Sequence, residues 1–314
     1  MSSTLLKIKI IVKRILKGKE SVFDVAEIQA VHDKIKLIED DTERITAFKT
    51  EIWQTESISG SFIQGTNESV RGAAYIMNKQ VNDYFLEKCT RGDTVLDIGS
   101  GHGVVSEYLA MNGMKVTAVD VSEALLEAFS KRISRKNLAI KIKTGDAYNI
   151  PCENEEFDKV VARMFLPHFA DWPVVLKEMV RVTKKGGNLL VHFSSKENSR
   201  LASQLGIRDC AFGTSPETID PAKFYAETDD KELSTICASL GLEVVDRTPV
   251  SFFLHNRIFG NQVGQELYDQ FQREMELKLS DEKIKDFVLW FDRIITANSV
   301  PALSHFNIIS FKKL

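Results

Sequence analysis

The chain has 314 residues, of which 43% are hydrophobic and 27% are charged, a composition that is ordinary for a soluble globular protein. Its formal net charge of -3 argues against general nucleic-acid binding, which needs a basic surface. The four cysteines form no CxxC pair, and no run of about 18 apolar residues is present. We therefore expect a cytoplasmic protein without a metal site, a disulfide framework or a membrane-spanning helix.

The first segment of the chain is strongly basic, because residues 1–19 carry six Lys or Arg residues and no acid. On a helical wheel, the basic residues of the segment 4–18 lie mostly opposite an apolar side formed by Leu5, Ile8, Ile11, Val12, Ile15 and Leu16. Such a helix either rests on an anionic membrane surface, which would make the protein peripheral to the membrane, or docks on protein. It begins a helical N-terminal extension that we predict over residues 1–57.

After a loop at residues 57–67 and a helix at 70–88, short apolar strands alternate with amphipathic helices. Ser122 is a good N-cap for one of these helices. The alternation predicts right-handed crossovers and a parallel sheet covered on both faces. In chain order, the predicted elements are strand 94–98, helix 104–111, strand 115–119, helix 122–135, strands 140–143 and 159–162, helix 171–182, a turn at 186–187, and strand 188–193.

The alternation ends near residue 195. An irregular segment is expected at 195–227 because it contains several Gly and Pro residues. The remaining predicted elements are a helix at 229–240, a strand at 242–253, a helical region at 256–298 and a strand at 305–311. We therefore predict one α/β domain over residues 58–314, with insertions at about 195–228 and 254–302.

A glycine-rich segment, Val95-Leu96-Asp97-Ile98-Gly99-Ser100-Gly101-His102-Gly103, lies at the junction of the first strand and its helix. Glycines at such a junction allow a ligand to approach the backbone at the carboxyl edge of the sheet. The spacing is GxGxG, and Val104 stands where a dinucleotide fingerprint has its third glycine. The Asp97 carboxylate would repel a pyrophosphate but suits a cationic sulfonium ligand.

Two further acids follow predicted strands. Asp120 ends the second strand and could accept hydrogen bonds from ribose hydroxyls. Asp146 follows the third strand and could accept a hydrogen bond from an adenine amine. Each acid alone is as easily a solvated turn residue, but their order along the chain favours a nucleoside site.

These segments resemble the class I S-adenosylmethionine (AdoMet)-dependent methyltransferases, and in particular the type 11 group that includes ubiquinone-biosynthesis enzymes. The second half of the resemblance lies in Phe157-Asp158, Leu166-Pro167-His168, Glu178, Arg181-Val182 and Lys185-Gly186-Gly187. Lys185 occupies the position of the usual proline. The resemblance implies a doubly wound, mostly parallel, seven-stranded Rossmann-like sheet whose last strand is antiparallel.

The resemblance also implies roles for individual residues, with AdoMet as the cofactor. Gly99 and Gly101 would line its methionine part, and Asp97 would organise their loop. Val121 would pack on the adenine, and Arg163 would face the methionine end through its backbone carbonyl. The expected cofactor-binding residues are Asp97, Gly99, Ser100, Gly101, Asp120, Val121, Asp146, Ala147 and Arg163.

Methyl transfer to a hydroxyl acceptor also needs a base that removes the proton. His168, after the fourth strand, is the best-placed candidate, although it could simply hold its loop, with Asp171 capping the next helix. His192 alternates within a strand and is expected to be packed. No Asp/Asn-Pro-Pro-Tyr/Phe segment, acidic metal cluster or cysteine follows the fourth strand, which argues against nucleic-acid and catechol-type methylation.

We therefore predict an AdoMet-dependent methyltransferase whose partner is a small-molecule, lipid or glycan acceptor, with O-methylation favoured. One alternative is a protein of the same fold that is catalytically silent and acts as a scaffold or regulator. Another is an enzyme dependent on NAD or on a nucleotide sugar.

Overall fold

The computed structural model describes residues 25–55, 72–169, 171–204, 230–250, 265–299, 304 and 306–314. The predicted amphipathic helix 4–18, the loop 57–67 and the greater part of the segment 195–227 lie outside these residues. Within the described ranges, no helix combines the length and the apolar character needed to cross a membrane.

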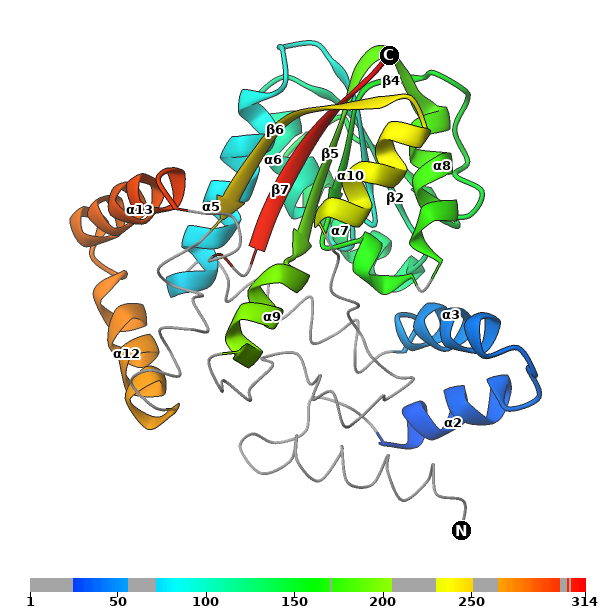
Figure 1. Ribbon diagram of the computed structural model, residues 1–314, viewed down its shortest axis with the longest axis horizontal. Coiled ribbons are helices and arrows are strands. Elements are labelled where there is room, and N and C mark those ends of the chain that lie inside the picture. The colour runs from blue at the N-terminus through cyan, green and yellow to red at the C-terminus, as the bar shows by residue number, and fades with distance from the viewer. Residues whose placement is uncertain are drawn as a thin grey trace.

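A seven-stranded sheet with the order β3-β2-β1-β4-β5-β7-β6 forms the centre of the molecule (Figure 1). The pairs among β1 to β5 are parallel, and β7 runs antiparallel between β5 and β6. The fold class and the antiparallel last strand are confirmed. The strands are β1 (Thr94–Ile98), β2 (Lys115–Asp120), β3 (Lys141–Thr144), β4 (Phe157–Arg163), β5 (Thr183–Ser194), β6 (Leu242–Val250) and β7 (Phe306–Lys313).

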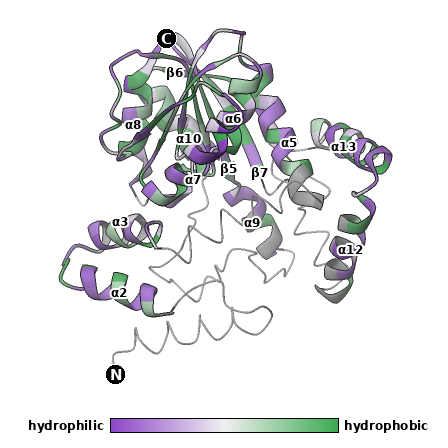
Figure 2. Cartoon of the chain, turned by 180° about the vertical axis from the view of Figure 1, so that it is seen from behind, coloured by the Kyte–Doolittle hydropathy of each residue, from purple (hydrophilic) through white to green (hydrophobic). Residues whose placement is uncertain are grey.

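Helices cover both faces of the sheet, which explains why its central strands are apolar on both sides. The described helices are α2 (Val25–Ile35), α3 (Asp41–Ile52), α5 (Gly72–Glu87), α6 (Val104–Met111), α7 (Glu123–Ser134), α8 (Trp172–Val182), α9 (Lys196–Gln204), α10 (Asp230–Ser239), α12 (Gln265–Lys278), α13 (Glu282–Ala297) and the short 3-10 helix η1 (Leu166–His168). One core cluster joins the strands to α8 and α10. A second cluster joins them to α5 and α6 on the other face. Figure 2 shows the hydrophobic strands at the centre.

The strand order reverses between β1 and β4, because the chain adds β2 and β3 on one side of β1 and β4 and β5 on the other. In open parallel sheets, ligands bind at such a switch point, beyond the carboxyl ends of the strands. This edge therefore positions the candidate site.

Three sequence-based boundaries are corrected. Residues 196–204 of the segment predicted to be irregular form α9. Gly186-Gly187 lies within β5 and not before it. The register passes from Phe157–Thr183 to Lys159–Asn188, so the pairing with β4 is irregular at the glycines. Within the described part of the predicted helical region 256–298, α12 and α13 are separate helices, because Asp281 starts α13 by accepting bonds from the N–H groups of Lys283 (2.9 Å) and Ile284 (3.4 Å).

The two outer strands are irregular or short. β3 has four residues, including Lys141. β6 has a register irregularity between Val244 and Asp246 and carries Pro249. Proline cannot donate to a strand ladder, so it is confined to such edges.

Helices α2 and α3 form a hairpin, defined here as residues 25–55, at the carboxyl edge of the sheet (Figure 1). The hairpin has a small core of its own, made of Val31, Ile35, Phe48 and Ile52. The division of the chain into an extension at 1–57 and a domain at 58–314 stays a prediction.

Candidate functional site

The glycine-rich loop after β1 is tied to the end of β2 by its own backbone. The N–H groups of Gly99 and Ser100 both donate to the Val119 carbonyl, at 2.9 and 3.1 Å. The Gly101 N–H donates to Asp120 Oδ2 at 2.7 Å. These bonds bring the predicted glycine loop and the predicted ribose-binding acid together at one edge of the sheet.

The three glycines of this loop have left-handed backbone but different surroundings, with φ of 68° at Gly99, 54° at Gly101 and 79° at Gly103. A Cβ at Gly99 would lie 2.1 Å from the Phe165 ring, and one at Gly103 would lie 2.3 Å from the Phe129 ring. A Cβ at Gly101 would meet only Leu125 Cδ1, at 4.0 Å. The lack of a side chain at Gly99 and Gly103 therefore lets an aromatic ring pack against the backbone, whereas the backbone of Gly101 faces open space.

Ser100 adds a second sign that this loop faces a ligand. Its Oγ is buried and has no hydrogen-bond partner among the described residues. Buried hydroxyl groups are normally paired, and an unpaired one often marks a place where a ligand or water binds. The open side of Gly101 and the Ser100 hydroxyl thus mark the same short stretch of backbone.

Asp97 supports the loop from inside the protein. Its carboxylate is 1% exposed. Asp97 Oδ2 accepts bonds from the Ser106 N–H (3.1 Å) and the Ser106 hydroxyl (2.6 Å) at the start of α6. Burial raises the pKa of Asp97 to about 7, against the effect of these bonds. Its described contacts thus support a loop-organising role more than that of a direct counter-charge to a cation.

The two strand-end acids are held in different ways. Asp120 Oδ1 accepts a bond from the Ser122 N–H (2.9 Å), so both of its oxygens bind backbone, and burial raises its pKa. Asp146 is exposed, and its Oδ1 accepts a bond from the Tyr148 N–H at 2.9 Å. The Gly145 N–H donates to the Asp120 carbonyl at 3.0 Å, so the two acids belong to neighbouring turns.

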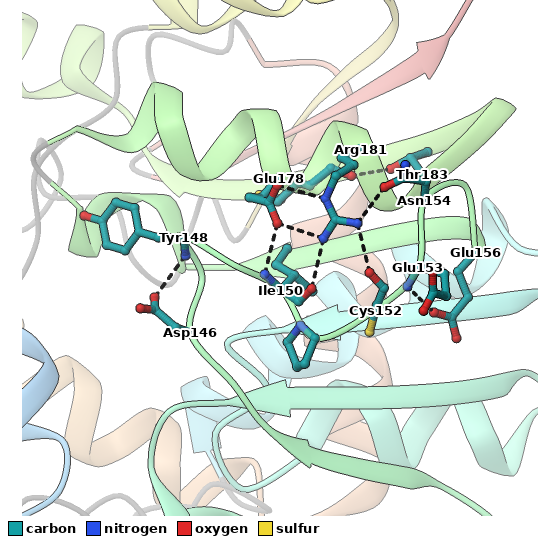
Figure 3. A network of polar contacts seen from close by, with 12 residues as sticks. Asp146, Tyr148, Ile150, Cys152, Glu153, Asn154, Glu156, Glu178, Arg181 and Thr183 are labelled. Carbon is teal, nitrogen blue, oxygen red and sulfur yellow. Dashed lines mark hydrogen bonds and ion pairs between the residues drawn. The ribbon is translucent and has the colours of Figure 1, made fainter.

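The loop that follows Asp146 is anchored on α8 by Arg181 and Glu178 (Figure 3). Arg181 donates to the carbonyls of Ile150 (2.9 Å) and Cys152 (2.9 Å). It also donates to both oxygens of Glu178, each at 2.8 Å. Glu178 Oε2 accepts a bond from the Ile150 N–H at 3.0 Å. The Glu-x-x-Arg spacing in the sequence therefore fixes the loop that carries Asp146.

Asp171 does not act as a helix cap, contrary to the expectation for this position. It precedes α8, but its side chain makes no capping bond. Asp171 Oδ1 accepts a bond from the Tyr148 hydroxyl at 2.5 Å. Asp171 thus joins the loop after β4 to the loop that carries Asp146.

Arg163, at the end of β4, directs its side chain toward α5, where its guanidinium donates to Asn78 Oδ1. Burial lowers its pKa to about 10, so it keeps its charge at neutral pH. His192 is opposite Arg163 in the register of β5 and is 0% exposed, as expected for a packed residue. Burial and the nearby Arg163 charge lower the pKa of His192, so it is neutral. The expected role of the Arg163 backbone carbonyl stays a prediction.

His168 ends η1, and its ring lies edge-on to the Trp53 ring, with 5.4 Å between ring centroids. Trp53 and Gln54 follow α3, and sequence reasoning did not connect them with the site. Gln54 Nε2 donates to the Val121 carbonyl (2.6 Å), and Ser122 Oγ donates to the Trp53 carbonyl (2.8 Å). No local sequence signal predicts these contacts, because they join residues 67 and 69 positions apart.

The described residues contain no group of three or more His, Cys, Asp or Glu side chains that could hold a metal ion.

Comparison with known proteins gives a consistent result. Residues 96–191 match the family described as a methyltransferase domain of type 11. The chain is 28% identical over 180 residues to a ubiquinone biosynthesis O-methyltransferase of Coxiella burnetii, and the aligned region covers 57% of this chain and 76% of that protein. It is 37% identical over 100 residues to a demethylmenaquinone methyltransferase of Corynebacterium urealyticum, and the aligned region covers 32% of this chain and 41% of that protein. Among solved structures, a SAM-dependent methyltransferase from Aquifex aeolicus is 20% identical, with a TM-score of 0.46 and coverage of 61% of this chain and 92% of that one.

Proposed function

Because this chain is a class I AdoMet-dependent methyltransferase of the type 11 group, we propose that it O-methylates a hydroxylated, quinone-type small molecule. The observation that carries the proposal is the 180-residue alignment with an enzyme named a ubiquinone biosynthesis O-methyltransferase. This alignment is longer than the matched domain 96–191, so the likeness extends beyond the segment that is expected to hold the cofactor. The demethylmenaquinone methyltransferase aligns over only 41% of its length, so the longer alignment with the O-methyltransferase supports oxygen as the methylated atom.

The residues at the sheet edge fit AdoMet. The open side of Gly101 and the buried Ser100 hydroxyl lie where the methionine part of the cofactor is expected. Each carboxylate oxygen can accept more than one hydrogen bond, so Asp120 can bind ribose hydroxyls while it holds the backbone. Asp146 is exposed and can accept a bond from the adenine amine, with the buried Ala147 beside it. Bound AdoMet supplies a methyl group on a positively charged sulfur for in-line transfer.

The acceptor must lose a proton as its oxygen bonds to the methyl carbon, while the electrons of the broken carbon–sulfur bond stay on sulfur. We propose His168 as the base that takes this proton, because it lies in the loop after β4 at the carboxyl edge. His192 is the matched comparison, since its ring is neutral but fully buried in β5. Arg163 places a positive charge near this part of the sheet and favours an acceptor that carries a carbonyl or ionised oxygen.

The proposal is tested by incubating the full chain with AdoMet and a panel of hydroxylated quinones, their phenolic precursors and matched acceptors that lack the hydroxyl group. Formation of a methoxy product, identified by mass spectrometry and proton NMR, is expected only with the hydroxylated members. His168→Gln should lower kcat at least about 100-fold and remove the acidic limb of the pH–rate profile, because general-base catalysis contributes about 10²–10⁴. His192→Gln should keep that limb. A methyl group found on carbon, or turnover of none of the quinone-type acceptors by a protein that binds AdoMet, refutes the assignment.

Contact with a membrane through residues 4–18 and a cytoplasmic location are part of this proposal. The six positive charges of residues 1–19 favour an anionic lipid surface, where an apolar acceptor would be concentrated. Sedimentation with anionic liposomes should therefore be lost when residues 1–19 are deleted. Unchanged sedimentation of the shortened protein would rule out this segment as the membrane contact.

A further inference from the structure

We propose that the hairpin of residues 25–55 is part of the cofactor site, where Trp53 and Gln54 act as positioning residues that close the adenosine half over bound AdoMet. The inference rests on the proposed placement of the adenosine at Asp120 and Val121. It adds residues that lie outside the matched methyltransferase domain, which begins at residue 96.

The two helices of the hairpin pack together as one unit. Its two helices bury their own apolar cluster. Lys34 Nζ and Glu51 Oε1 form an ion pair at 2.6 Å between the two helices. Trp53 and Gln54, which follow α3, form hydrogen bonds to the α/β domain. A pair of helices with an internal core can keep its own packing when its contacts with the sheet edge form or break.

The hydrogen bonds at that end reach the turn that follows the ribose-binding acid. Gln54 Nε2 donates to the Val121 carbonyl at 2.6 Å, and Ser122 Oγ donates to the Trp53 carbonyl at 2.8 Å. Ser122 is 0% exposed, and its N–H holds Asp120 Oδ1 at 2.9 Å. The hairpin is therefore only one residue removed from the carboxylate that is expected to bind the ribose, and it fixes the turn on which the adenine is expected to pack.

Trp53 also reaches the opposite side of the site. Its ring meets the His168 ring edge-on, with 5.4 Å between centroids and an angle of 80° between planes. His168 belongs to the loop after β4, whereas Val121 and Ser122 belong to the loop after β2. One residue of the hairpin thus contacts two loops that flank the reversal in strand order. Figure 1 shows α3 beside this carboxyl edge of the sheet.

Two consequences follow from this arrangement. The cofactor and the hairpin should stabilise each other, because both hold the turn at Val121 and Ser122. The product S-adenosylhomocysteine (AdoHcy) should leave more slowly when the hairpin is seated, because its adenosine end is covered. Trp53 and Gln54 should consequently affect the KM for AdoMet and not the KM for the acceptor.

The test measures AdoHcy binding to the full chain, by calorimetry for the Kd and by stopped-flow for the dissociation rate. Gln54→Ala removes one exposed hydrogen-bond donor, and Trp53→Leu removes the contact with His168 while it keeps an apolar side chain. Gln54→Ala should raise the Kd about fivefold, which is the effect of one lost hydrogen bond. Trp53→Leu should raise the Kd to a similar extent through the lost ring contact with His168. Leu37→Ala is the matched control, because Leu37 is 84% exposed at the other end of the hairpin. It should bind AdoHcy like the parent protein.

Hydrogen exchange separates this role from a general loss of stability. In the parent protein, AdoHcy should slow the exchange of amides in residues 41–55, and Gln54→Ala should abolish this slowing while the sheet stays protected. The inference is overturned if AdoHcy leaves exchange in 41–55 unchanged and if Gln54→Ala binds AdoHcy with the parent Kd and dissociation rate. A parent protein that binds no AdoHcy would instead refute the cofactor site itself, so the two failures are distinguishable.

Discussion

The glycine loop offers a sharp test of which backbone faces the ligand, since its three glycines share one conformation but have different neighbours. Alanine in left-handed backbone costs roughly 1–2 kcal/mol at any of the three positions. At Gly103, the added Cβ would also lie 2.3 Å from the Phe129 ring, and overpacking of this kind costs about 1–3 kcal/mol more. Gly101→Ala should therefore lower the free energy of unfolding by about 1–2 kcal/mol, and Gly103→Ala by about 2–5 kcal/mol.

Binding should show the opposite order. The Cβ of Gly101→Ala would project into open space, with Leu125 Cδ1 at 4.0 Å as its nearest neighbour, and it would occupy the place of the ligand. We expect AdoHcy to bind this variant at least about tenfold more weakly, a loss of about 1.4 kcal/mol. Gly103→Ala should bind AdoHcy closer to the parent affinity at temperatures where it is folded.

Urea unfolding and calorimetry on the same two preparations provide both numbers. The reasoning fails if Gly101→Ala binds AdoHcy as tightly as the parent protein, because the open side of that glycine would then face no ligand. It fails equally if both variants lose the same stability, since the Phe129 ring would then not restrict the space at Gly103.

Two further predictions concern the supports of the site. Arg181→Met should lower the free energy of unfolding, measured in urea, by about 2–3 kcal/mol. It leaves the carbonyls of Ile150 and Cys152 and the Glu178 carboxylate without their described partner, and the Arg181 and Glu178 side chains are only 29% and 20% exposed. A change below about 0.5 kcal/mol would show that the network does not hold the loop. The pKa of Asp97 is raised to about 7 in the folded protein. The folded protein therefore keeps a proton that the unfolded chain loses near pH 4. The free energy of unfolding should consequently fall as the pH rises between these two values. Asp97→Asn should remove about 1.4 kcal/mol per pH unit from this slope, and unfolding curves with an unchanged slope would contradict the assignment.

Local sequence patterns predicted the part of the fold that surrounds the glycine loop. The bounds of β1 and α6 agree with the sequence-based boundaries, because an apolar run, a glycine turn and an amphipathic pattern follow one another without ambiguity. Ser122 caps α7, with its Oγ accepting a bond from the Leu125 N–H at 3.4 Å, as expected from its position before an amphipathic run. These are local effects, in which a residue and its partner lie a few positions apart.

Elements that depend on distant partners were missed or displaced. The sequence of α9 is polar and has no apolar stripe of helical period, so its helix could not be separated from the irregular chain around it. The glycine pair at 186–187 predicted a turn, but β5 pairs with β4 on both sides of the glycines and runs through them with an irregular register. In the same way, nothing near Gln54 indicates that it bonds to the Val121 carbonyl. Such contacts are determined by tertiary packing, which overrides local preference.

The outer strands of the sheet govern how this protein can aggregate or self-associate. A long, flat edge strand exposes unpaired backbone groups and recruits strands from other molecules. Here one edge is four residues long and carries Lys141, and the other is bent and interrupted by Pro249. Continuous sheets across two copies are therefore disfavoured. Helix α13 offers a different kind of surface for self-association, because its apolar residues Phe287, Trp290 and Ile294 are 59%, 59% and 48% exposed.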